Sequence, residues 1–178
     1  MKTTKKVIAL IVAIIMTMSL VVLPASAATV GDLSRKLTTE FPRFPVLRID
    51  SPEKEYVRLL QRFLYVYPQT HETVYNTDDV YHGIDGGFGI VTDTALRTFQ
   101  LNFFGANGVD GAAGPATWGA IYSCLRPSST SAHYIYDGEA SYNRWIMSYI
   151  FSGSSTCKLY TYNASDNRFM DPFRTITV

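Results

Sequence analysis

The sequence predicts a mainly α-helical protein, in which a small three-helix bundle over residues 46–125 is followed by a short C-terminal α+β extension. Three observations lead to this prediction. Apolar residues recur with a helical period between residues 51 and 67. The frame Asp-Gly-x-x-Gly-x-x-Thr occurs at Asp85 and again at Asp110, and the composition changes after Leu125. These observations place the helices first and the extension last.

Residues 1–27 have the pattern of a secretory signal peptide. A basic start at residues 2–6 precedes an apolar run over residues 7–23, and small residues follow at Ala25 and Ala27. The apolar run is also close to the length that spans a bilayer, so an uncleaved membrane anchor is the alternative. We expect cleavage near Ala27, secretion of the mature chain, and no stable membrane insertion afterwards.

The charge of the mature chain excludes some partners. The full chain has a formal charge of +1, and removing the three lysines of the signal peptide changes this to −2. No run of Lys or Arg remains, which argues against nucleic acid and against docking on anionic lipid. The sequence has no Cys-x-x-Cys motif and no cluster of Cys and His, so we expect no metal and no cofactor.

The first bundle helix is expected at residues 51–67. Ser51 is a good N-cap, Pro52 suits the first helical position, and Pro68 should end the helix. Residues 28–45 before it contain two prolines and are interpreted as a lead-in segment. Residues 68–83 after it are polar and rich in tyrosine, and are interpreted as a long loop.

Each Asp-Gly frame is expected to turn the chain and to start a helix. In the second frame Gly114 is a permissive cap and Pro115 fits the first helical position, so Gly89 should cap the preceding helix by the same register. The apolar positions of the three helices form the expected core: Val57, Leu60, Leu64, Phe88, Leu96, Phe99, Trp118, Ile121 and Leu125.

After the bundle, residues 126–133 are expected to form a linker and residues 134–178 a tyrosine-rich extension of α+β character and otherwise unknown fold. Export places Cys124 and Cys157 in a disulfide-permissive setting, so the sequence favours a bridge between them, with two free thiols as the alternative. Such a bridge would tie the extension to the bundle.

The ordered motifs of residues 46–125 resemble the peptidoglycan-binding domain family, the three-helix modules of bacterial cell-wall hydrolases. The stretches that carry the resemblance are VRLLQRFL, IDGGFGIVTDTALRTFQ and VDGAAGPATW. Two features depart from the family pattern: residues 68–84 form a longer connection, and residues 126–178 are too short for the catalytic domain that family members commonly carry. The matching positions are Leu47, Arg48, Val57, Leu60, Gln61, Leu64, Asp85, Gly86, Phe88, Gly89, Thr92, Ala95, Phe99, Gln100, Asp110, Gly111, Gly114, Pro115, Thr117 and Trp118.

The resemblance implies a secreted, non-catalytic module that binds bacterial peptidoglycan, at its glycan strand or stem peptide, and presents or anchors the C-terminal extension. Two alternatives stay open. The bundle could be a scaffold for protein interactions, or the protein could be a cell-wall hydrolase. For a hydrolase, Cys157 with His133 and Asp137 is the only arrangement of nucleophile, base and orienting group that the sequence offers.

Five residues are candidate ligand contacts. Tyr75 and Tyr81 in the long loop could cover sugar faces, while Asp85, Gln100 and Asp110 could bind hydroxyl and peptide groups. Each has a structural alternative. The tyrosines could pack on the extension, the aspartates could satisfy turn amides, and Gln100 could bond between helices.

Overall fold

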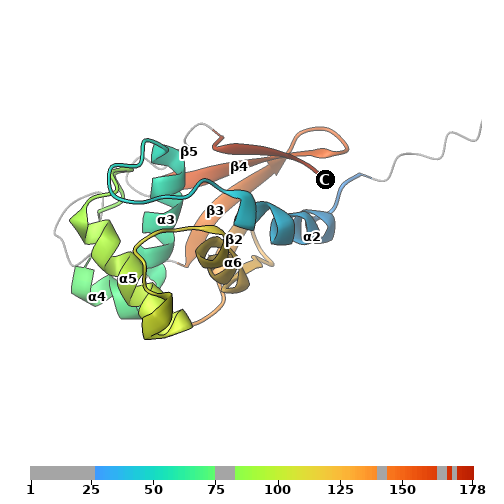
Figure 1. Ribbon diagram of the computed structural model, residues 1–178. Helices are drawn as coiled ribbons and strands as arrows, with labels where there is room; N and C mark the ends of the chain where they lie inside the picture. The colour runs from blue at the N-terminus through green and yellow to red at the C-terminus, as the bar shows by residue number, and fades with distance from the viewer. Residues whose placement is uncertain (1–26, 75–82, 140–143, 164–167, 170–171) are drawn as a thin grey trace, which may run out of the picture.

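The computed structural model describes residues 27–74, 83–139, 144–163, 168–169 and 172–178, and it shows an α+β fold (Figure 1). Helices gather on one side of an antiparallel sheet. The helices are α2 (Val30–Glu40), η1 (Phe41–Arg43), α3 (Lys54–Val66), α4 (Pro68–Val74), α5 (Ile90–Phe104), η2 (Ala106–Gly108) and α6 (Pro115–Ser123). The strands are β1 (Leu125–Pro127), β2 (His133–Tyr136), β3 (Trp145–Phe151), β4 (Thr156–Asn163), β5 (Arg168–Phe169) and β6 (Arg174–Thr177).

The three predicted helices are present as α3, α5 and α6, but the prediction of a mainly α protein with a three-helix bundle is only partly right. The lead-in segment contains α2, which begins with a capping box. Thr29 Oγ1 accepts from the Asp32 amide at 3.2 Å, and Asp32 Oδ2 accepts from the Thr29 amide at 2.9 Å. Leu33 and Leu37 of this helix are fully buried, so α2 is part of the core.

Pro68 has a double role at the end of α3. It ends α3 as predicted, and it is also the first residue of α4, where a missing N–H costs nothing. The prediction of an irregular loop was therefore wrong for residues 68–74. Tyr75 and Tyr81 lie outside the described residues.

The C-terminal segment forms an antiparallel sheet in the order β1-β2-β3-β4, with β5 and β6 both pairing along the far edge of β4. β1 begins directly after α6, so residues 126–133 are a strand and a turn rather than a plain linker. In the described part of residues 134–178 every regular element is a strand. This corrects the expectation of α+β character there, because the period of Trp145, Ile146 and Tyr149 fits a strand as well as a helix.

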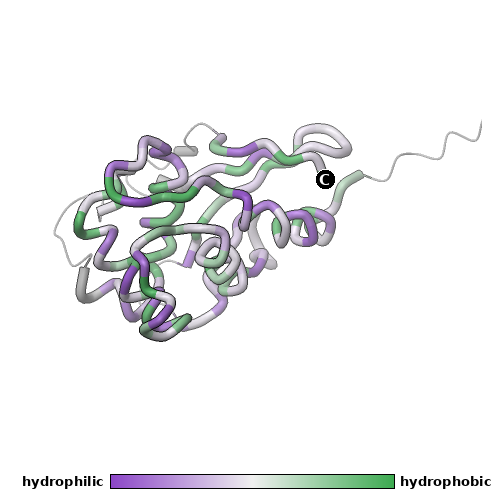
Figure 2. Tube along the Cα trace, viewed as in Figure 1, coloured by the Kyte–Doolittle hydropathy of each residue, from purple (hydrophilic) through white to green (hydrophobic). Residues whose placement is uncertain are grey.

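The sheet and the helices share one core, because α3 lies between them. Every residue from Leu59 to Val66 is buried. One face of α3 meets the sheet, where Arg62 Nε donates to Trp145 O at 2.5 Å and Thr161 Oγ1 donates to Glu55 at 3.0 Å. Figure 2 shows hydrophobic stretches on α3 and on the strands behind it.

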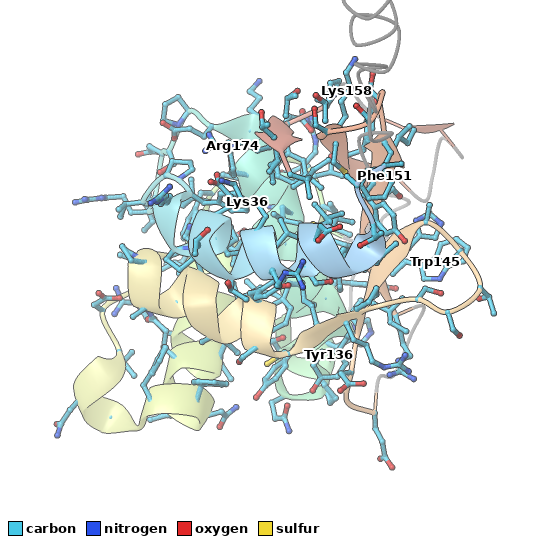
Figure 3. All side chains as sticks on the ribbon, turned by 90° about the vertical axis from the view of Figure 1, so that its right-hand side faces the viewer. Lys36, Tyr136, Trp145, Phe151, Lys158 and Arg174 are labelled. Atoms are coloured by element: carbon cyan, nitrogen blue, oxygen red, sulfur yellow. The ribbon has the colours of Figure 1, made fainter. Side chains whose placement is uncertain are left out.

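A buried carboxylate ties α2 to the last strand. Glu40, at the end of α2, accepts a hydrogen bond from Arg174 Nη2 of β6 at 2.8 Å, and Lys36 lies 3.9 Å from it. Figure 3 shows Lys36 and Arg174 on this side of the molecule. The Arg174 hydrogen bond is the main cause that holds the pKa of Glu40 below its usual value. The N-terminal helix is thus fixed to the C-terminal end of the fold.

The predicted disulfide does not form, since Cys124 and Cys157 are both free thiols. Cys157 pairs with Phe151 at the last residue of β3, whereas Cys124 O accepts from the Asp137 amide beside the start of β3. A seven-residue strand spans roughly 20 Å. Two cysteines that lie at opposite ends of β3 are far beyond the ~7 Å between Cα atoms that a disulfide allows.

We predict that the helical part does not fold without the sheet. A variant with residues 28–125 exposes the face of α3 that carries Leu59, Arg62 and Val66, and the lost burial removes much of the core. It should lack the cooperative thermal transition that the 28–178 protein shows by circular dichroism. A sharp transition of similar enthalpy per residue in the shorter variant would contradict the shared core.

We also predict two free thiols with unequal reactivity. Burial raises the pKa of Cys157 to about 11 and also raises the pKa of Cys124, which is only partly buried. A thiol-reactive label should therefore react slowly, and only at Cys124, with the native non-reduced protein. In denaturant it should react at both cysteines, as measured by mass spectrometry. Protein that takes up no label in denaturant would contain the bridge after all.

Candidate functional site

The first Asp-Gly turn is held by a buried glutamine of α3. Gln61 Nε2 donates to Asp85 Oδ1 at 2.8 Å, to Gly87 O at 3.0 Å and to Thr92 Oγ1 at 3.1 Å. Its Oε1 accepts from the Gly86 amide at 2.9 Å, which fixes the orientation of the side-chain amide. Asp85 Oδ1 also accepts from the Gly87 amide at 2.7 Å. One side chain thus organises the whole turn.

The second turn repeats this network with a glutamine of α5. Gln100 Nε2 donates to Asp110 Oδ1 at 2.7 Å, to Ala112 O at 3.0 Å and to Thr117 Oγ1 at 3.2 Å. Its Oε1 accepts from the Gly111 amide at 2.9 Å, and Asp110 Oδ1 accepts from the Ala112 amide at 2.8 Å. The repeated sequence frame therefore corresponds to a repeated hydrogen-bond network.

An arginine three residues before each glutamine extends the repeat. Arg58 Nη2 donates to Asp85 O and Arg97 Nη2 donates to Asp110 O, both at 3.3 Å. Gly86 and Gly111 have φ values of +81° and +71°, so the turns need glycine there. The helix in front of each turn therefore supplies both an amide and a guanidinium to it.

Residues 45–51 connect the two turns. Leu47 and Ala113 exchange backbone hydrogen bonds of 3.3 and 2.9 Å, and the Asp50 amide donates to Phe88 O at 3.1 Å. Trp118 Nε1 donates to Pro45 O at 2.9 Å, which holds the start of this segment against α6. We call the surface formed by residues 48–54, 85–89 and 110–112 the turn face.

The turn face is hollowed beside each turn. One hollow of about 380 Å³ lies between Asp50, Lys54 and the first turn. Another, of about 250 Å³, is lined by Arg48, Asp93, Arg97 and the second turn. The repeat thus places a polar hollow next to each Asp-Gly pair.

Two carboxylates are exposed on this face. Asp85 and Asp110 each use Oδ1 inside their turn, and in the described part of the chain Oδ2 of neither makes a hydrogen bond. The Ala112 amide is the main cause that holds the pKa of Asp110 below its usual value, and Gln100 adds to the effect. Asp110 is therefore ionised at neutral and mildly acidic pH.

A larger hollow of about 600 Å³ lies elsewhere, between α2 and Ser154–Ser155. Its cations already have partners, since Arg35 pairs with Asp32 and Lys36 lies 3.9 Å from Glu40. Its polar groups are therefore less available to a ligand than those of the turn face, which is the better candidate site.

The structure brings three of the five candidate residues to the turn face. Asp85 and Asp110 are exposed there, and Gln100 is buried beneath them with 1% of its surface exposed. Tyr75 and Tyr81 lie outside the described residues. Arg48 and Arg97 were not among the sequence candidates. The Arg-x-x-Gln spacing, which α3 and α5 share, could have pointed to Arg97.

The candidate hydrolase residues do not assemble. Cys157 is fully buried, and the raised pKa of its thiol disfavours the nucleophilic thiolate. His133 Nδ1 instead lies 2.7 Å from Ser148 Oγ, and Asp137 pairs with Arg126. Within the described residues, no group of three His, Cys, Asp or Glu side chains could hold a metal ion.

A family model described as "Putative peptidoglycan binding domain" matches residues 53–121. The match confirms the predicted resemblance. The matched residues, hereafter the family segment, run from the N-cap of α3 to α6 and include both turns. No curated protein and no solved structure matches the chain. The resemblance was expected over residues 46–125, and the family segment lies within that range.

We predict that both glutamines are essential to the stability of the turns. Gln61→Ala leaves the Gly86 amide without its acceptor, and Gln100→Ala does the same to the Asp110 and Gly111 amides. Each change should lower the free energy of unfolding by about 1–3 kcal/mol. Thr94→Ala on the exposed side of α5 is the control and should change it by less than about 0.5 kcal/mol. Urea unfolding measures all three. Equal stability of the glutamine variants and the control would contradict the role of the amides.

Proposed function

We propose that the protein is a secreted, non-catalytic module that binds peptidoglycan through the turn face. The observation that carries this proposal is that the family segment contains both turns, and that each turn presents an exposed aspartate beside a hollow. A rigid frame holds these groups in place, so little conformational entropy is lost when a ligand binds.

The chemistry of the turn face suits a wall polymer. Asp85 and Asp110 can each accept hydrogen bonds from sugar hydroxyl or peptide N–H groups through Oδ2. Gln100 contributes indirectly, because its amide orients Asp110. Lys54 and Arg48 on the same face can donate to acetamido and carboxylate oxygens.

Tyr75 and Tyr81 remain part of the proposal. They precede the first turn by ten and four residues, and aromatic rings near a polar hollow commonly cover the apolar faces of sugars. The proposal therefore assigns them to glycan and the aspartates to polar groups of the same polymer.

In this proposal the protein is exported and has a binding role without catalysis. Residues 1–27 would direct secretion and be removed near Ala27, while an uncleaved anchor is the alternative. Within the described residues no helix is long and apolar enough to cross a membrane. The separation of Cys157 from His133 and Asp137 supports a binding role over a hydrolase. The sheet packs on α3, so the extension belongs to the same folded body as the binding face.

Sedimentation with purified insoluble peptidoglycan tests the proposal. We predict that the 28–178 protein sediments with the wall, and that the double variant Asp85→Asn/Asp110→Asn loses affinity about tenfold or more. Asparagine keeps Oδ1 as an acceptor and removes the charge. Tyr81→Ala is a second variant, which tests the proposed glycan contact and should also bind more weakly than the wild type. Arg35→Gln, on α2, is the control and should bind like the wild type.

Two results would count against the proposal. A wild-type protein that sediments no better than an unrelated protein of similar charge would show that the wall is not the ligand. If the double variant and Tyr81→Ala both sediment as well as the wild type does, another surface of the protein binds the wall.

A further inference from the structure

The hollow at the second turn continues along α5. Arg97 lines both this hollow and a neighbouring one of about 340 Å³, which is also lined by Thr94, Thr98, Leu101, Ala106 and Val109. We call the two together the α5 groove. One end of the groove is charged and the other is apolar, so an occupant that fills both ends should carry both kinds of group.

The charged end holds one cation and one anion that do not pair with each other. In the described part of the chain, the Arg48 guanidinium makes no hydrogen bond or ion pair, and Asp110 Oδ2 makes none either. Arg97, by contrast, is already engaged: its Nε lies 2.8 Å from Asp93 Oδ2 and its Nη2 donates to Asp110 O. The groups available to a ligand are therefore Arg48 and Asp110.

The apolar end is the larger of the two hollows, and apart from Arg97 it is lined by threonine and apolar side chains. Leu101 keeps 50% of its surface exposed, and Thr94 and Thr98 line the same hollow. Covering the exposed surface of Leu101 with an apolar group removes that surface from water, which favours binding. The hollow beside the first turn lacks such an end, since its lining is mostly polar residues and glycine.

We propose that the α5 groove binds the stem peptide of peptidoglycan at a residue that carries both a carboxylate and an ammonium group. Arg48 receives the carboxylate, Asp110 Oδ2 receives the ammonium, and the apolar end accepts the methyl group of a neighbouring alanine. This inference rests on the proposed function and makes it more specific.

The chemistry of the polymer supports this assignment over the glycan strand. A diamino acid with a second carboxyl group supplies both an ammonium and a carboxylate, and the D-alanine that follows it in the stem peptide supplies a methyl group. The sugars of the glycan are largely N-acetylated and carry no ammonium. A bidentate contact between Arg48 and a carboxylate is among the stronger polar interactions. The two opposite charges fit the stem peptide better than the sugar chain.

Isothermal titration of the 28–178 protein with a soluble stem tetrapeptide tests the inference. The probe is an L-Ala–D-Glu–diamino acid–D-Ala peptide that is acetylated at its N-terminus, as the polymer is acylated there, and that keeps a free side-chain amine and free carboxylates. We expect Arg48→Gln to weaken binding about tenfold or more, and Asp110→Asn to do the same while keeping its turn hydrogen bonds. Arg35→Gln is the matched control and should bind like the wild type. Arg48→Gln should not affect folding, because the guanidinium has no partner in the described residues.

Two modified peptides identify which group each residue binds. Amidating the carboxylates should weaken binding to the wild type but add nothing to the loss in Arg48→Gln. Acetylating the side-chain amine should weaken binding to the wild type but add nothing to the loss in Asp110→Asn.

Sedimentation in parallel separates this inference from the proposed function. A protein that sediments with the wall but binds no tetrapeptide overturns the inference and leaves the proposed function intact. The inference is also overturned, and the proposed function left intact, if Arg48→Gln and Asp110→Asn bind the tetrapeptide as well as the wild type does. A protein that neither sediments nor binds the peptide overturns both.

Discussion

The burial of residues 59–66 of α3 on all sides is the constraint on which the rest of the structure depends. One face of the helix packs on the sheet through Arg62 and Glu55, and Gln61 reaches from it to the first turn. A helix that is buried all round cannot remain stable when either neighbour is removed, because the exposed apolar face would then meet water. The sheet therefore acts on the turn face through α3, although none of its strands belongs to that face.

The buried glutamines show how a polar side chain can specify a loop. A primary amide carries two donors and an acceptor with two lone pairs, and a buried one is costly unless these are satisfied. Gln61 and Gln100 meet this requirement almost entirely with backbone and side-chain atoms of their turns. The first glutamine precedes its aspartate by 24 residues and the second by 10, yet the networks agree. The insertion between α3 and the first turn is thus accommodated without changing the turn.

The helices and turns could be predicted from sequence because their signals are local. Pro68 and the Gly-Pro pair at 114–115 mark helix ends through backbone chemistry that needs no distant partner. Ser51 was wrongly predicted as an N-cap: α3 begins at Lys54 with Glu53 as its N-cap, and Ser51 Oγ instead accepts from the Arg48 amide. The sheet was harder to predict, because the aromatic and β-branched residues of β3 fit either period until a partner strand is known. The disulfide prediction was wrong for a related reason: sequence reveals that two cysteines exist and not that β3 separates them. The site was half predicted. The aspartates follow from the frame, whereas Arg48 matters only because the backbone pairing of Leu47 with Ala113 places it beside the second turn.

The two turns are equivalent in their frames and differ in their surroundings, and this difference bears on recognition. Asp85 shares its hollow with Lys54 and Asp50, so charges of both signs already lie close to it. Asp110 likewise has charges of both signs beside it, from Asp93, Arg97 and Arg48, but its hollow continues along α5 toward Leu101. A repeated frame can therefore fix two carboxylates with the same geometry while the neighbouring segments decide what each one binds. In such a design a change in Gln61 or Gln100 alters stability first, because it loosens a turn. If the proposed groove binds the stem peptide, a change in Arg48 should alter recognition alone, because the frame does not use that side chain.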